Sequence, residues 1–153
     1  MKKFTLLSFL LALLGASSAW GAGSTSTPEP AIDPEYARAQ QLVQRKEWTP
    51  AVQVLEDFTR TNPKSADGFN LLGYSYRNLK RMDEALAAYN QALKLEPSHK
   101  GAHEYIGIAF IQLGQIDKAR EHLVALDKIC TFTCEEYRDL KKAYEEASKT
   151  KYK

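Results

Sequence analysis

Apolar positions recur along this chain at a fixed spacing of 34 residues. The matched columns are Ala51, Ala85 and Ala119; Leu55, Tyr89 and Leu123; Phe58, Ala92 and Leu126; Ala39, Gly73 and Gly107; and Leu42, Tyr76 and Phe110. Each period carries two apolar stripes with the spacing of amphipathic helices. A period of this length built from two helices is typical of stacked helix–turn–helix units. We therefore predict an all-α fold, a right-handed α-α superhelix (solenoid) of three helix-turn-helix repeats plus a C-terminal capping helix.

Capping residues and prolines predict where the individual helices begin and end. Ser, Thr and Asp side chains accept hydrogen bonds from the free N–H groups of a helix start, and proline is tolerated there. The predicted N-caps are Asp33, Thr49, Ser65, Ser98 and Thr133, the last forming a capping box with Glu136. The predicted helices are 34–45, 50–61, 66–79, 82–95, 99–113, 116–129 and 134–149. Gly114 follows the fifth helix at a position suited to left-handed backbone geometry.

Two glycines, Gly73 and Gly107, lie in the middle of predicted helices. Glycine costs about 0.5–1 kcal/mol relative to alanine at such positions. That cost is tolerable if a neighbouring helix approaches too closely for a larger side chain. The alanines at 51, 85 and 119 are expected to mark the matching contact on the second helix of each pair. We therefore expect Gly73 to face a tightly packed neighbour and not solvent.

The apolar spacing of a repeat's first helix returns once more near the C-terminus, at Tyr137, Leu140 and Tyr144. Lys141 stands where the repeat pattern would place a glycine, so no close neighbour is expected behind it. One face of this helix would cover the last pair while the other meets water, as the end of a repeat stack requires. We expect it to be a cap.

These residues resemble the tetratricopeptide repeat family. Residues 66–97 match its consensus at Phe69, Leu72, Gly73, Tyr76, Ala85, Tyr89, Ala92 and Pro97. Residues 100–131 match less completely, with His103 in place of the usual aromatic residue, and residues 32–63 are degenerate in their first half. The resemblance implies a scaffold that holds extended or helical peptides in a concave groove. It is specific for the fold and does not identify the ligand.

The candidate groove residues lie opposite the packed stripe on the first helix of each pair. They are Tyr36, Gln40 and Gln44; Asn70, Tyr74 and Arg77; and Glu104, Tyr105, Ile108 and Ile111. Aromatic rings, amides and an arginine suit hydrogen bonding to a peptide backbone with apolar anchoring. Alternatively, Tyr105, Ile108 and Ile111 pack against the seventh helix. Family members that bind acidic chaperone tails use a lysine- and arginine-rich clamp, which these positions do not reproduce.

The N-terminal region predicts export. Lys2 and Lys3 precede an apolar run that is too short to span a bilayer, and small residues ending at Ala19 suit a signal peptidase. The predicted organisation is a signal peptide (1–19), a flexible linker (20–32), a repeat domain (33–149, with repeats 32–65, 66–99 and 100–133 and a capping helix 134–149) and a basic tail (150–153). An uncleaved signal anchor is the alternative.

The net positive charge of the chain disappears when the predicted signal peptide is left out of the count. The chain has 21 Lys+Arg against 19 Asp+Glu, and two of the lysines fall within residues 1–19. The remainder is neutral and has no basic block, so nothing favours nucleic acid or an anionic membrane as a partner. We expect a protein or peptide partner, no membrane association after signal removal, and a monomer or weak oligomer.

Cys130 and Cys134 are the only cysteines, and they lie at the turn into the seventh helix. In an exported chain, an even number at this spacing favours a disulfide. Closing so small a loop contributes about 2 kcal/mol in the chain-entropy model. A redox-active dithiol and half of a metal site are the alternatives, although Cys-x-x-x-Cys is not the Cys-x-x-Cys redox motif.

No catalytic constellation is recognisable: no Ser/His/Asp set, no Gly-rich phosphate loop and no acid pair in a plausible cleft. His99 and His103 are four residues apart, but no carboxylate or cysteine at suitable spacing completes a metal site. We therefore expect neither an enzyme nor a cofactor. The leading hypothesis is a small exported bacterial protein of this family, a periplasmic scaffold or adaptor of the envelope. The alternative is a thiol-redox or redox-sensing factor that uses Cys130 and Cys134.

Overall fold

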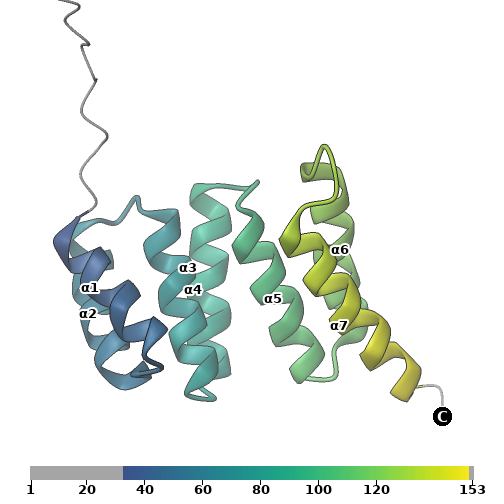
Figure 1. The fold of residues 1–153 in the computed structure, drawn as a ribbon, viewed down its shortest axis with the longest axis horizontal. Helices are drawn as coiled ribbons and strands as arrows, with labels where there is room; N and C mark the ends of the chain where they lie inside the picture. The colour runs from purple at the N-terminus through teal and green to yellow at the C-terminus, as the bar shows by residue number, and fades with distance from the viewer. Residues whose placement is uncertain (1–32, 152–153) are drawn as a thin grey trace, which may run out of the picture. The chain divides into compact units, whose positions relative to one another are not determined.

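The computed structural model describes residues 33–151, which form seven α-helices and contain no strand (Figure 1). The helices are α1 (Pro34–Gln44), α2 (Trp48–Thr61), α3 (Ala66–Asn78), α4 (Met82–Leu95), α5 (Lys100–Gln112), α6 (Ile116–Ile129) and α7 (Glu135–Lys151). The predicted all-α repeat superhelix is confirmed. The predicted signal peptide, linker and last tail residues lie outside the described residues. Within residues 33–151, no helix combines the length and apolarity needed to cross a membrane.

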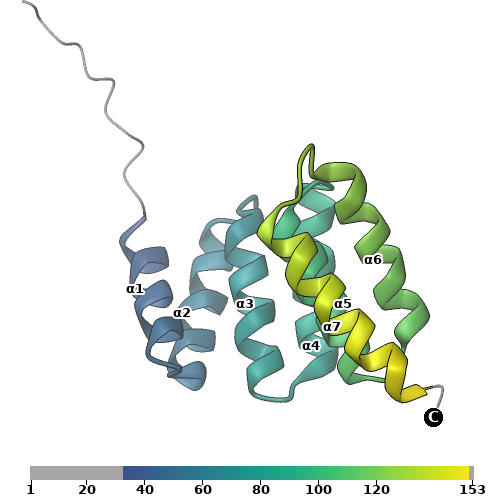
Figure 2. The same ribbon diagram turned by 45° about the vertical axis from the view of Figure 1, so that its right-hand side comes forward.

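Consecutive helices pack in pairs, and each pair packs against the next. Helix α7 lies beside α5 and also contacts α6 (Figures 1 and 2). The largest fully buried apolar side chains come from five different helices: Leu55, Tyr89, Ile106, Leu126 and Leu140. Burying each aliphatic side chain of this set contributes about 1.5–3 kcal/mol. One core cluster joins α1 to α5, from Ala39 to Ile106, and Leu126 and Leu140 are buried further along, in α6 and α7.

All three turns within the helix pairs have the same backbone conformation. Lys46, Lys80 and Gly114 have φ values of 61°, 65° and 72°, and they are spaced by the repeat period. After α1, the N–H of Lys46 bonds to the Val43 carbonyl at 2.9 Å and the next N–H bonds to Leu42, also at 2.9 Å. The same two bonds close α3 and α5. This is the Schellman arrangement that satisfies the last carbonyls of a helix, and two of the three turns place a lysine where glycine is preferred.

Two of the predicted N-caps are confirmed. The Asp33 carboxylate accepts hydrogen bonds from the N–H groups of Glu35 and Tyr36, at 2.8 and 3.3 Å. The Ser65 hydroxyl accepts one from the N–H of Gly68 at 3.1 Å. These bonds supply partners for N–H groups that a helix leaves free in its first turn.

Three other predicted helix starts are wrong by one or two residues. Helix α2 begins at Trp48, immediately after the left-handed turn, so Thr49 is already helical. The cap of α5 is His99, whose Nδ1 accepts from the Ala102 N–H at 3.1 Å, and not Ser98. Helix α7 begins at Glu135, one residue later than a Thr133 cap requires. At α2, the preceding left-handed turn replaces the hydroxyl cap that we expected from Thr49. At α5, a ring nitrogen of His99 replaces the hydroxyl cap that we expected from Ser98.

The close approach predicted at the two glycines is confirmed. A Cβ atom on Gly73 would lie 2.6 Å from the ring of Tyr89 on α4, and one on Gly107 would lie 2.6 Å from the methyl groups of Leu140 on α7. Both distances are too short for real carbon atoms. We had expected the alanines at 51, 85 and 119 to provide the nearest atoms, but they do not. A tyrosine of the same pair and a leucine of the cap fill these spaces instead.

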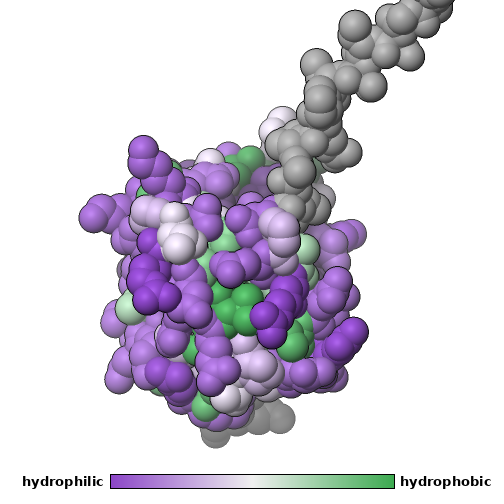
Figure 3. All heavy atoms as spheres, turned by 90° about the vertical axis from the view of Figure 1, so that its left-hand side faces the viewer, coloured by the Kyte–Doolittle hydropathy of each residue, from purple (hydrophilic) through white to green (hydrophobic). Residues whose placement is uncertain are grey.

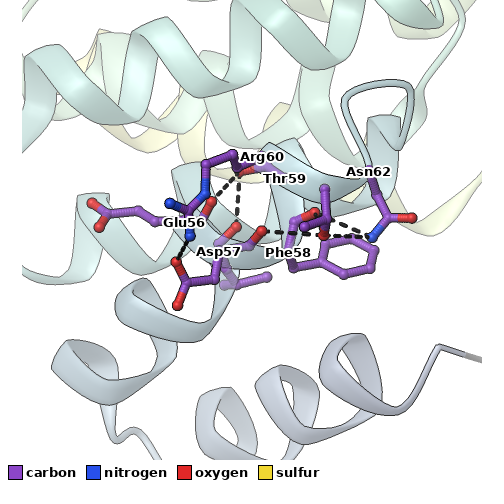
Figure 4. A network of polar contacts seen from close by, with 8 residues as sticks. Glu56, Asp57, Phe58, Thr59, Arg60 and Asn62 are labelled. Carbon is purple, nitrogen blue, oxygen red and sulfur yellow. Dashed lines mark hydrogen bonds and ion pairs between the residues drawn. The ribbon is translucent and has the colours of Figure 1, made fainter.

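Side chains bonded to the helix's own backbone close the end of α2 (Figure 4). Thr61 Oγ1 and Asn62 Nδ2 donate to the Phe58 carbonyl at 3.1 and 3.2 Å. Asp57 and Arg60 form an exposed ion pair one turn earlier. Because the next residue is proline, the helix cannot continue, and these bonds add to the helical bond that the Phe58 carbonyl already accepts from the Asn62 N–H at 2.8 Å.

The two ends of the described stack differ. At one end, Leu140 of α7 is 0% exposed while its neighbour Lys141 is exposed, so α7 caps the last pair as predicted. At the other end, an apolar patch lies in the middle of the face formed by α1 and α2 and is surrounded by polar residues (Figure 3). Leu42, Val43 and Val54 pack on the core from these helices and are only partly buried. No described helix covers that face.

Candidate functional site

Three of the candidate groove residues lie together between α3 and α5. The ring centroids of Tyr74 and Tyr105 are 4.9 Å apart. The guanidinium carbon of Arg77 lies 5.3 Å from the Tyr74 ring and 5.8 Å from the Tyr105 ring. We call Tyr74, Arg77 and Tyr105 the aromatic–arginine cluster. Because α3 and α5 belong to different repeats, the cluster joins the second repeat to the third.

Helical spacing and ring electrostatics explain why this cluster forms. Tyr74 and Arg77 are three residues apart on α3, so they share one face of the helix. A guanidinium over an aromatic face contributes about 0.5–1 kcal/mol at exposed sites and more where water is excluded. Burial, with the nearby Glu104 charge, raises the pKa of Tyr105 to about 12, so its hydroxyl keeps its proton at neutral pH.

Unsatisfied polar atoms border the cluster. In the described part of the chain, Arg77 Nε and Asn70 Oδ1 are buried without a hydrogen-bond partner. A Cβ atom on Gly101 would lie 3.1 Å from Asn70 Nδ2, so the Asn70 amide lies against the first turn of α5. A buried unpaired polar group costs about 1–3 kcal/mol.

An acidic cavity of about 300 Å³ lies between α5 and α7. It is lined by Gly101, Glu104, Tyr105, Glu135, Glu136 and Asp139. Burial, and then the negative charges of Asp139 and Glu136, raise the pKa of Glu104 to about 7. Glu104 is therefore partly protonated at neutral pH. The packing of α7 on α5 places Glu135 and Glu136 around this cavity.

The remaining groove candidates are not part of the cluster. Tyr36 packs on Phe58 of α2 with ring centroids 5.3 Å apart, and burial raises its pKa to about 12. Gln40, Ile108 and Ile111 are half-buried and Gln44 is exposed. Tyr105 lies against the Tyr74 ring and also lines the cavity between α5 and α7.

Cys130 and Cys134 lie at disulfide-bonding distance, with their Cα atoms 5.7 Å apart. They flank the segment that joins α6 to α7. Phe132, between them, is 88% exposed. Cys130 follows the last residue of α6 and Cys134 precedes the first residue of α7, so a bond between them bridges the segment where the cap is attached to the stack.

Sequence reasoning missed two contributors to this surface. Trp48 packs edge-on against Tyr74, with ring centroids 5.7 Å apart. It begins α2, and the 34-residue columns contain no aromatic equivalent that would have drawn attention to it. The acids of α7 were missed because the sequence does not show that they adjoin Glu104 of α5.

Residues 66–99 match the family model described as "Tetratricopeptide repeat". The chain is 29% identical over 97 residues to the "Peroxisomal targeting signal receptor" of Saccharomyces cerevisiae, a match that covers 62% of this chain and 16% of the receptor. The chain therefore spans less than a fifth of that relative's length. The family match covers one helix pair, α3 and α4.

Solved structures share the fold. The Yersinia enterocolitica type III secretion translocator chaperone SycD superposes with a TM-score of 0.71 and 15% identity, covering 78% of this chain and 84% of that chain. The TPR2B domain of yeast Sti1, solved as a complex with pHsp70, gives a TM-score of 0.67 and 20% identity, covering 76% and 94%. At these identities the likeness concerns the arrangement of helices alone.

Proposed function

We propose that this protein is a protein- or peptide-binding scaffold whose ligand lies across the first helices of the pairs, over the aromatic–arginine cluster. The observation that carries this proposal is the combination at one place of two half-buried rings and a guanidinium. Aromatic residues and arginine are the side chains that most often dominate binding energy at interfaces. No catalytic role is proposed for these residues.

The polar atoms beside the cluster favour a ligand with an exposed main chain. Arg77 Nε is a buried donor and Asn70 Oδ1 a buried acceptor, and neither has a partner among the described residues. A peptide backbone presents one carbonyl and one N–H per residue and would satisfy both once binding exposes them. Relatives support the same class, since the similar Sti1 domain was solved with pHsp70 and the yeast relative is named as a targeting signal receptor.

The location in the bacterial envelope is part of the proposal and rests on the N-terminal sequence. Residues 1–19 have the charged start, short apolar run and small-residue site of an export signal. A periplasmic location would also keep Cys130 and Cys134 oxidised, so that their disulfide fastens the cap. The partner would then be a protein of the envelope.

A crosslinking pull-down from the envelope fraction tests the proposed surface. The variant combines Tyr74→Ala, Arg77→Ala and Tyr105→Ala, and the matched control combines Gln53→Ala, Asn90→Ala and Lys94→Ala at exposed positions of α2 and α4. Circular dichroism first establishes that both remain folded. We expect the cluster variant to lose the partners that wild type and control retain. An unchanged partner set would remove this surface from consideration.

The alternative, a thiol-redox factor, has a direct test. Alkylation of the full chain in glutathione buffers of graded potential measures how readily the Cys130–Cys134 pair opens. A structural disulfide resists the glutathione pool, whereas a redox-active pair is reduced within its range. Ready reduction would favour the redox function, and resistance favours the binding scaffold.

A further inference from the structure

Two histidine rings face each other inside the third helix pair. The Nδ1 atoms of His103 on α5 and His122 on α6 are 3.0 Å apart. His103 Nε2 lies 3.0 Å from the carbonyl oxygen of Pro97, and His103 is 9% exposed. Because Pro97 belongs to the turn between α4 and α5, this chain of hydrogen bonds ties the turn, α5 and α6 together.

The Pro97 carbonyl determines the proton positions, since it can only accept. His103 Nε2 must therefore carry a proton and donate it. In a neutral ring the other nitrogen is then an acceptor, so His122 Nδ1 must donate to His103 Nδ1. The neutral pair holds one proton between the two Nδ1 atoms, and its rings are opposite tautomers.

The surroundings of the pair disfavour a second positive charge. Burial, and then the positive charge of His103, lower the pKa of His122 to about 4. From α5, Phe110 stacks on the His122 ring with centroids 5.7 Å apart, and from α6 the Lys118 ammonium lies 5.2 Å from that phenyl ring. The turn contributes a carbonyl. Among the described residues, α7 included, His103 is the one ionisable group whose charge shifts the pKa of His122.

We propose that His103 and His122 form an acid-sensitive latch that holds the third helix pair closed. One added proton still leaves a donor opposite an acceptor, so the bond between the rings persists. A second added proton places an N–H on both Nδ1 atoms, and two like-charged donors at 3.0 Å repel. The rings then separate, and α5 loses its polar tie to α6. The latch therefore opens below the ordinary titration range of histidine.

Opening of the latch would also disturb the candidate binding surface, because α5 carries Glu104 and Tyr105 as well as His103. This consequence rests on the proposed function. Glu104 titrates in the opposite sense. Its raised pKa means that acidification stabilises the folded state through this group. The tests below therefore act on the latch itself and need no ligand, so their outcome is independent of whether the surface binds a peptide.

Nitrogen-detected NMR of the imidazole rings in the full wild-type chain tests the proton positions without any substitution. At pH 7 we expect His103 to be protonated on Nε2 and His122 on Nδ1. Two Nε2-protonated rings at neutral pH would show that the Nδ1–Nδ1 bond does not form and would overturn the proposal.

The acid response is tested with His122→Asn, because the Asn amide nitrogen takes the place of Nδ1 and the side chain cannot be protonated. If the facing Nδ1 carries a proton, this amide can turn and offer its oxygen. Hydrogen exchange of the full chain is measured at pH 7 and pH 4, with α3 and α4 as the internal reference. We expect wild-type protection factors in α5 and α6 to fall about tenfold or more relative to that reference.

His122→Asn should keep that protection at pH 4. The matched control is His99→Asn, which preserves a capping acceptor at the start of α5 and leaves the latch intact. It should lose protection as wild type does. Equal losses in wild type and His122→Asn, or retained protection in wild type at pH 4, would contradict the latch.

Discussion

At the scale of single residues, Gly73 determines how closely α3 and α4 approach. Replacing it with leucine forces the Tyr89 ring, which is 0% exposed, out of the core. We expect Gly73→Leu to lower the free energy of unfolding by about 3 kcal/mol or more, as overpacking of a core does. Asn90→Ala, at an exposed position of α4, should change it by less than about 0.5 kcal/mol. Urea unfolding measures both, and equal effects would refute this packing assignment.

A second residue-scale prediction concerns pH and Glu104. Its pKa is about 7 in the folded chain against 4.5 for an unperturbed glutamate, so its contribution to stability is present below pH 4.5 and is lost as the pH rises towards 7. Glu104→Gln should therefore be more stable than wild type at pH 8, by about 1 kcal/mol after allowance for solvent screening. The two should unfold alike at pH 4.5. A difference that is independent of pH, or one shared by Glu121→Gln on the exposed face of α6, would contradict this account.

Residue-level features were predictable from sequence only where the chemistry is local. Asp33 and Ser65 act as N-caps because their side chains reach N–H groups two or three residues away. The cap by His99 was missed because a ring nitrogen is an uncommon substitute for a hydroxyl. The left-handed turns at Lys46 and Lys80 were missed because lysine gives no sign of positive φ. Only their register with Gly114 could have indicated them.

At the scale of helices, α7 packs on the stack through Leu140, which is 0% exposed and fills the space left by Gly107. Leu140→Ala should lower the free energy of unfolding by about 2–5 kcal/mol, because the cavity lies between helices that cannot easily collapse. Lys141→Ala, one residue away and exposed, is the matched control. Denaturant unfolding of the two variants checks this prediction. A small loss for Leu140→Ala would mean that α7 is not anchored through this contact.

The number of helices and the capping role of α7 were predictable because apolar periodicity reports which residues pack, whereas three helix starts were not predicted correctly. The identity of the facing atoms was not. The sequence indicated that Gly73 and Gly107 need a close neighbour, but the neighbours Tyr89 and Leu140 come from different helices, which periodicity alone does not distinguish.

At the scale of the whole described stack, stability should decrease from the middle pair towards the ends. In a repeat array each unit is stabilised by its neighbours, and only α3 and α4 have a full pair on both sides. We expect native-state hydrogen exchange at pH 7 to be slowest in α3 and α4 and faster in α1 and α2, whose outer face lacks a covering helix among the described residues. Uniform protection along the stack would indicate a single cooperative unit instead.

The candidate surface was predictable as a set of helix positions but not as a geometry. Sequence alone placed Tyr74, Arg77 and Tyr105 on the same side of successive first helices. It did not show that the three side chains contact one another, or that Trp48 joins them, because those distances depend on the angle between neighbouring pairs.

The shared geometry of the three within-pair turns has a consequence for protein engineering. Each helix pair closes with the same two hydrogen bonds. A further copy of residues 66–99 inserted after position 99 would therefore pack between helix pairs of the same kind on both sides. The length of the array is thus an adjustable design variable, and a longer version would keep both original ends.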